Sequence, residues 1–68
     1  MTKIAKQYAN PNNGGQERVI RDGDKFFINS NWGQGFCRPD TEVSRGQMEM
    51  CLRHTNAPAE IADAILAN

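Results

Sequence analysis

The chain has 68 residues, with eight basic and eight acidic side chains, and therefore no net charge at pH 7. A domain of this size buries only about 60% of the surface that its unfolded chain exposes, which suffices for one thin core and leaves no room for a deep catalytic cavity. We therefore expect one small domain that is not an enzyme.

Residues 1–16 are predicted to form a flexible N-terminal arm, because the stretch ANPNNGGQ is polar and has too little apolar surface to order itself. Ile4 and Tyr8 have the i, i+4 spacing of one side of a helical turn, although so short a helix is unstable alone. The segment is either a frayed terminus or an arm that orders on a partner. In the second case Ile4 and Tyr8 are the apolar anchors, and Lys3 and Lys6 supply charge.

A β-hairpin is predicted around Asp22-Gly23, which separates the strand-like runs RVIR and KFFI. A two-residue loop at this pair would set Arg21 opposite Asp24. A three-residue loop would set Arg21 opposite Lys25. Because like charges repel across a strand pair, the first register is favoured.

A third strand is predicted over residues 32–36. In this strand Trp32, Gln34 and Phe36 would share one face, and the glycines between them would mark a bulge or a close approach of another backbone. Trp32 is either a core residue or an interface residue, and the sequence leaves both open.

The first helix is predicted to follow Ser44, because Ser44 can cap the helix while Gln47 reaches back from the third helical position. An earlier start, capped by Asp40 or Thr41, is the alternative. The buried stripe of this helix is expected to be Met48, Cys51, Leu52 and Thr55.

A second helix is predicted from the stretch NAPAE. Asn56 or Ala57 would cap it, Pro58 would lie in its first turn, and Glu60 would suit the positive end of the helix dipole. Its buried stripe is expected to be Ile61, Ala62, Ile65 and Leu66.

Strands that precede helices in this way are typical of the α+β class. We expect a single domain over residues 17–68, in which two C-terminal helices cover an antiparallel β-hairpin or three-stranded sheet.

The candidate metal ligands are Cys37, Cys51 and His54. Structural zinc normally takes four ligands that arrive in close pairs, and Cys37 stands alone. Cys51 lies on the apolar stripe, where a buried thiol is an ordinary small hydrophobe. One His three residues from one Cys on the same helix also lacks the geometry of an activated nucleophile. We expect no metal, no cofactor and no catalysis.

The expected location is the cytoplasm. No apolar run approaches the roughly 20 residues that span a bilayer, and the N-terminal sequence has no apolar signal core. Two cysteines without a secretory signal are typical of free thiols in a reducing compartment. We expect no membrane contact.

The predicted function is binding to a larger protein or protein complex as a short regulator or inhibitor. A virus-encoded protein that acts on host machinery, such as RNA polymerase or a defence complex, would fit this size. Trp and Arg are enriched at interface hot spots. The predicted partner-binding residues are Ile4, Lys6, Tyr8, Arg18, Arg21, Lys25 and Trp32.

Charge is unevenly spread, since residues 1–39 carry +3 and residues 40–68 carry −3. We interpret this as attraction within the fold; steering of a partner is the alternative.

Nucleic-acid binding is the alternative function, through a basic hairpin with Arg18, Arg21 and Lys25 and a stacking surface from Trp32 or Phe27. The zero net charge weakens this hypothesis, because phosphate attraction dominates such binding. Homo-oligomerisation is a third hypothesis, because so thin a core gains stability from a partner.

Overall fold

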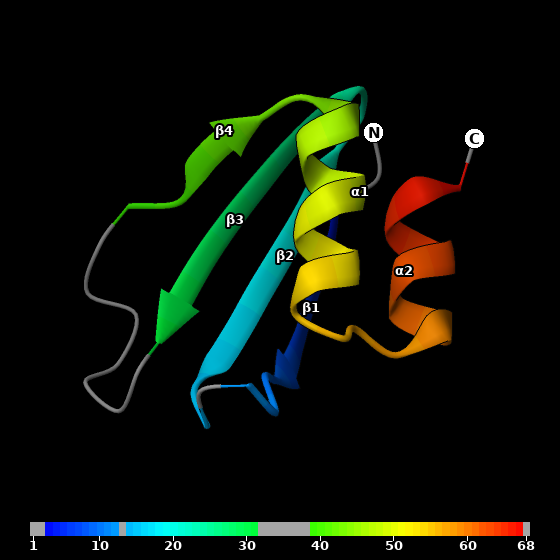
Figure 1. Ribbon diagram of the computed structural model, residues 1–68. Helices are drawn as coiled ribbons and strands as arrows, with labels where there is room; N and C mark the ends of the chain where they lie inside the picture. Colours follow the sequence, from blue (N-terminus) through cyan, green and yellow to red (C-terminus); the bar gives the residue numbers. More distant parts are fainter. Residues whose placement is uncertain (1–2, 13, 32–38, 68) are drawn as a thin grey trace.

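The structure, a computed structural model, describes residues 3–12, 14–31 and 39–67. Strands come first and helices follow (Figure 1). The elements are β1 (Lys3–Ala9), β2 (Gln16–Asp22), β3 (Lys25–Asn31), β4 (Thr41–Val43), α1 (Arg45–His54) and α2 (Ala59–Leu66). The predicted α+β class with two C-terminal helices is confirmed.

The four strands form one antiparallel sheet in chain order, β1-β2-β3-β4. Helix α1 contacts β3, and α2 contacts β1 and β2, so that both helices lie on the same side of the sheet (Figure 1). In the described part of the chain, no helix or strand lies over the other side. Among the described residues, helices therefore cover only one face of the sheet.

Strand β1 lies within the segment predicted to be an arm, and it pairs with β2 over all of its seven residues. The helical-turn interpretation of Ile4 and Tyr8 is wrong. The two residues are an even number of positions apart, so a strand also places them on one face. Here that face packs on the helices: Tyr8 is only 6% exposed, and Ile4 packs against the core.

The polar loop between β1 and β2 is tied down by hydrogen bonds. The Asn10 amide donates to the Gly15 carbonyl at 2.8 Å, which closes the loop. The Asn12 side-chain amide donates to the His54 carbonyl at 2.8 Å, at the end of α1. Polar contacts therefore hold the described residues of this loop in place. The prediction of an arm considered only the apolar surface of the segment.

The β2–β3 hairpin forms where it was predicted, but in neither predicted register. Asp22 pairs with Lys25, and the loop is Gly23-Asp24. Gly23 has a φ of +65°, and a positive φ at the first loop residue is the pattern of a type II′ turn. Opposite charges do face each other at the end of the hairpin, but the pair is Asp22 with Lys25, and Arg21 lies opposite Phe26.

The predicted third strand over residues 32–36, Trp32 included, lies outside the described residues. The next described strand is β4, which pairs with β3 through Val43 opposite Phe26 and Thr41 opposite Ile28. The alternative helix start at Asp40 or Thr41 is therefore wrong, because the chain is still extended there.

The predicted cap of α1 is confirmed. The Ser44 hydroxyl accepts a hydrogen bond from the Gln47 amide at 3.2 Å, and the Gln47 side-chain oxygen accepts one from the Ser44 amide at 2.8 Å. This reciprocal pair is a capping box.

The predicted cap of α2 is wrong. Pro58 is the N-cap and makes no side-chain hydrogen bond. Asn56 has a φ of +55°, its amide donates to the Arg53 carbonyl at 3.3 Å, and the Ala57 amide donates to the Leu52 carbonyl at 3.0 Å. These bonds form a Schellman motif, so Asn56 ends α1 and does not begin α2.

The core lies between the sheet and the two helices. Both predicted helical stripes are confirmed: Met48 and Leu52 are buried on α1, Ile65 is buried on α2, and the other stripe residues are partly buried. The core residues are Tyr8, Val19, Phe26, Met48, Leu52 and Ile65.

Candidate functional site

Side chains along each strand alternate between the helix side of the sheet and the opposite side, which we call the uncovered face. No described helix or strand lies over the uncovered face. It carries Lys3, Ala5, Gln7 and Ala9 from β1, Gln16, Arg18, Ile20 and Asp22 from β2, Lys25, Phe27 and Asn29 from β3, and Glu42 from β4.

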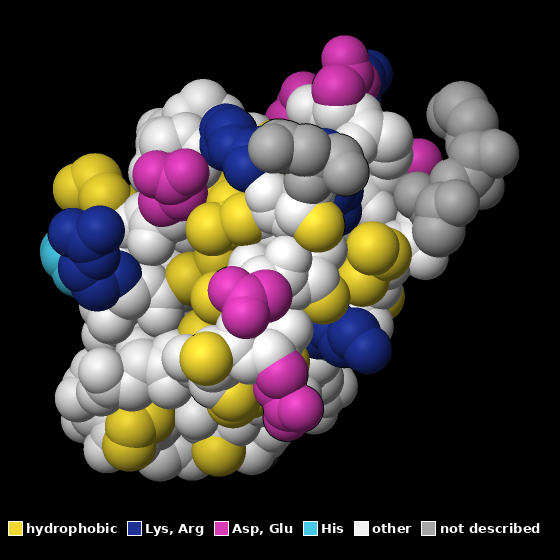
Figure 2. Space-filling model, turned by 90° about the vertical axis from the view of Figure 1, so that its right-hand side faces the viewer, with side chains coloured by type: hydrophobic (Ala, Val, Ile, Leu, Met, Phe, Trp, Pro, Cys, Tyr) yellow, Lys and Arg dark blue, Asp and Glu magenta, His cyan; other side chains and the backbone are white. Residues whose placement is uncertain are grey.

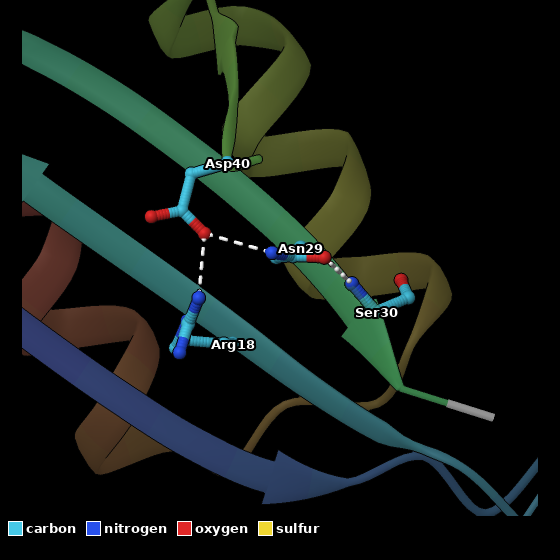
Figure 3. A network of polar contacts seen from close by, with 4 residues as sticks. All are labelled: Arg18, Asn29, Ser30 and Asp40. Carbon is cyan, nitrogen blue, oxygen red and sulfur yellow. Dashed lines mark hydrogen bonds and ion pairs between the residues drawn. The ribbon is translucent and has the colours of Figure 1, made fainter. Parts of the chain in front are cut away.

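A polar network crosses the uncovered face (Figure 3). The Arg18 guanidinium and the Asn29 side-chain amide both donate to the same oxygen of Asp40, at 2.8 and 2.9 Å. The Asn29 side-chain oxygen accepts from the Ser30 amide at 2.8 Å. The network thus connects β2, β3 and the segment that leads into β4.

The Asp40 carboxyl is held in its ionised form by this network. The hydrogen bond from Arg18 and, after it, the one from Asn29 lower the pKa of Asp40 below its usual value. Arg18 and Asp40 remain about one third exposed, at 33% and 31% of their side chains. The pair therefore fixes the relative positions of two surface segments and contributes at most about 1 kcal/mol to the free energy of unfolding.

An apolar row lies beside the network. Ala5 pairs with Ile20, and Ile20 pairs with Phe27, so the three side chains run across three strands. Ile20 is only 4% exposed, whereas Phe27 is half-buried and Ala5 is exposed. Charged and polar rows flank it on both sides: Lys3, Asp22 and Lys25 on one, and Gln7, Arg18 and Asn29 on the other. An apolar centre within a polar rim is the usual anatomy of a protein–protein interface.

The described charges on this face balance. With Asp40 included, the described residues of the face supply three basic and three acidic side chains, which are Lys3, Arg18, Lys25, Asp22, Asp40 and Glu42. A surface without net charge gives little of the phosphate attraction that drives nucleic-acid binding.

The predicted partner-binding residues are divided between the two faces. Arg18 and Lys25 lie on the uncovered face, and Trp32 lies outside the described residues. The other four lie on the helix side and are Ile4, Lys6, Tyr8 and Arg21. Among these, Lys6 is exposed.

Arg21 is used within the fold. Its guanidinium donates to the Ile65 carbonyl at 3.1 Å and lies 5.2 Å from the centre of the Phe26 ring. Arg45 donates in the same way to the Leu66 carbonyl. Helix α2 has no basic residue in its own last turn, so these two arginines satisfy its terminal carbonyls. Nothing in the local sequence around Arg21 reveals this partner, which lies 44 residues away.

Tyr8 is a core residue. Its hydroxyl shares a hydrogen bond of 2.5 Å with the Thr55 hydroxyl, and Thr55 donates to the Cys51 carbonyl at 2.6 Å. Burial raises the pKa of Tyr8 above its usual value. The ring that was predicted to anchor a partner is therefore enclosed by the protein itself.

A second polar cluster, which no local sequence signal indicates, is buried at the loop end of the sheet. Glu17 is 5% exposed, and both of its carboxylate oxygens accept hydrogen bonds: one from Ser30 at 2.6 Å and one from Asn10 at 3.1 Å. Because Asn10 belongs to the β1–β2 loop and Ser30 to β3, the Glu17 carboxylate links this loop to β3.

The candidate metal ligands are not brought together in the part of the chain that can be described. Cys51 is half-buried and His54 is exposed, while Cys37 lies outside the described residues. Over residues 3–12, 14–31 and 39–67, no group of three or more His, Cys, Asp and Glu side chains is placed to hold a metal ion. Burial raises the pKa of the Cys51 thiol, which keeps it in the less reactive protonated form.

Neither helix among the described residues is long and apolar enough to cross a membrane. Comparisons with protein-family models, curated proteins and solved structures each found no match.

Proposed function

We propose that the protein is a non-enzymatic cytoplasmic regulator or inhibitor that binds a larger protein complex through the uncovered face. The observation that carries this proposal is the apolar row of Ala5, Ile20 and Phe27 at the centre of a sheet face over which no described element lies, with charged rows on both sides.

Phe27 is the best candidate for an energetic anchor. It is half-buried, so a partner that covers this face can remove its remaining apolar surface from water. Side chains on paired strands are held in place before binding, which reduces the conformational entropy lost on association. The Arg18–Asp40 pair adds to this order by tying two segments of the rim together.

A protein partner fits this face better than a nucleic acid. A nucleic-acid surface gathers Lys and Arg, whereas the described basic side chains of this face are interleaved with as many acidic ones. A rim of mixed charge instead selects a protein surface of complementary pattern. A viral origin, with host RNA polymerase or a defence complex as the target, extends the proposal and fits the small size of the chain.

The proposal is tested by affinity capture from a lysate of the cells in which the protein acts. We expect Phe27→Ala to reduce recovery of a stoichiometric partner at least tenfold, because interface aromatics often contribute more than about 2 kcal/mol. Lys25→Glu alters the exposed rim without touching the core and should also reduce recovery. Circular dichroism confirms that each variant is folded.

The matched control is Lys6→Glu, which makes the same charge change at an exposed lysine on the helix side. Recovery should be unchanged in this variant. Equal recovery with wild type, Phe27→Ala and Lys25→Glu would contradict the proposal. Retention of nucleic acid that is lost in Lys25→Glu would favour the alternative function.

A further inference from the structure

The outward side of α1 carries an exposed stripe. Met48 and Leu52 of this helix face the core, so the residues at the spacing i, i+3, i+4 and i+7 on its other side face away from the sheet. These are Gly46, Glu49, Met50 and Arg53, which we call the α1 stripe. Met50 is 56% exposed and is the only large hydrophobic side chain classed as exposed among the described residues.

A shallow apolar groove borders the α1 stripe. It has a volume of about 270 Å³ and is formed where α1 and α2 meet. Figure 2 shows hydrophobic side chains at the surface among charged ones on this side of the molecule. The groove is lined by Glu49, Leu52, Arg53, Ala57, Ala62 and Leu66. Glu49 and Arg53 belong to both features, so stripe and groove form one continuous surface.

The charges of the α1 stripe are complementary to themselves. Glu49 and Arg53 are about 6 Å apart along the helix axis, one on each side of the level of Cys51. In an antiparallel pair of α1 helices with a twofold axis at that level, Glu49 of each copy lies opposite Arg53 of the other, and the two Met50 side chains lie close together. A parallel pair would oppose like charges at both positions.

The existing contacts leave these charges available. Glu49 lies 3.8 Å from Arg45 within the same helix, and its side chain is still 51% exposed. An exposed ion pair of this kind contributes little stability, so it competes weakly with a partner.

We propose that two copies of the chain associate through the α1 stripe as an antiparallel, twofold-symmetric pair. A chain of this size gains stability from burying further apolar surface, and its zero net charge imposes no long-range repulsion between copies. The uncovered face lies on the other side of the sheet from this interface, so the pair and the proposed partner complex are independent.

The test is sedimentation equilibrium of the full chain over a wide range of concentrations. Wild type should show a reversible dimer. Glu49→Arg and Arg53→Glu should each raise the dimer dissociation constant at least tenfold, because each sets like charges opposite each other twice. Both positions are exposed, so the variants should fold normally.

Two further experiments test whether the binding partner is a second copy of the chain. The double variant with Glu49→Arg and Arg53→Glu should dimerise like wild type, because both ion pairs are restored in reverse. Mixing the two single variants should produce a heterodimer, since every opposed pair is then attractive. Glu42→Arg is the matched control: this residue is exposed on the uncovered face, and its reversal should leave the dimer unchanged.

A protein that stays monomeric at all concentrations would overturn the proposal. So would a dimer that is unaffected by the single reversals, or two single variants that fail to associate when mixed. None of these results would affect the capture experiment on Phe27, which concerns the opposite side of the sheet.

Discussion

The hydroxyl of Tyr8 joins β1 to the end of α1 through Thr55. The variant Tyr8→Phe keeps the buried ring and removes only this bond. We expect the free energy of unfolding to fall by about 1 kcal/mol, the usual net value of one hydrogen bond. Urea denaturation near neutral pH measures the change.

The same variant also tests how Tyr8 makes the stability of the protein depend on pH. Because burial raises the pKa of Tyr8 above the ordinary value of about 10, its neutral form contributes stability that is fully present below about pH 10 and lost as the pH rises through the raised pKa. Tyr8→Phe should therefore lose less stability than wild type at alkaline pH. Equal losses would mean that the hydroxyl is not buried. Cys51, whose pKa is raised by burial, is present in both proteins, and its negative charge adds to the rise in the pKa of Tyr8.

Asp40 should act at the opposite end of the pH scale. Its pKa is lowered by Arg18 and Asn29, so its contribution is present above the ordinary value of about 3.9 and is lost as the pH falls through the lowered pKa. Asp40→Asn should cost up to about 1 kcal/mol at neutral pH, because the pair is partly exposed. Denaturation curves of both proteins should converge in acid. A gap that persists there would contradict an ionic role for Asp40.

Two glycines differ in what their positions demand of the backbone. Gly23 has a φ of +65° in the hairpin loop, and a side chain there is strained even though the space around it is open. Gly46 lies in the first turn of α1, also in open space, and needs no positive φ.

We therefore expect Gly23→Ala to destabilise the protein by about 1 kcal/mol. Gly46→Ala should stabilise it by roughly 0.5 kcal/mol. Thermal melts of the two variants side by side check the contrast. No loss of stability in Gly23→Ala would contradict the positive φ in the hairpin loop, and a loss in Gly46→Ala would contradict the open space around this position in α1.

Strand β1 is expected to be essential to the fold. Deletion of residues 1–9 removes Tyr8 from the core and uncovers Val19, which is 1% exposed. Because a core this small tolerates little loss, the truncated chain should be largely unfolded. Amide dispersion in a two-dimensional NMR spectrum shows this directly. A well-dispersed spectrum would instead support the interpretation of this segment as a dispensable arm.

Among the helices and strands, the features that could be predicted are those set by residues close together in the sequence. The cap of α1 was predictable because Ser44 and Gln47 lie within one turn. The second helix cap was not, because Asn56 suits both an N-cap and the left-handed end of a helix, and the hydrogen bonds of α1 decide between them. The hairpin was predictable in place but not in register, which changes with a shift of one residue in the loop.

At the scale of the whole molecule, the α+β class could be predicted from strands that precede helices. The site could not, because its face depends on which side of the sheet the helices pack. Alternation along the strands places Arg18 and Lys25 on one surface and Arg21 on the other, and the packing of the helices decides which of these surfaces is covered. Similarly, Arg21 reaches α2 only after the chain has folded back.

The proposed partner binds one face of the sheet, and Ala5 and Lys6 offer the sharpest test of which face this is. They are adjacent in β1, both exposed, and point to opposite faces. A photo-crosslinking amino acid placed at each position in turn, in the cells where the protein acts, reports what lies within reach. Crosslinks to one partner protein from position 5 and none from position 6 are predicted. Crosslinks from position 6 alone would contradict binding through the uncovered face.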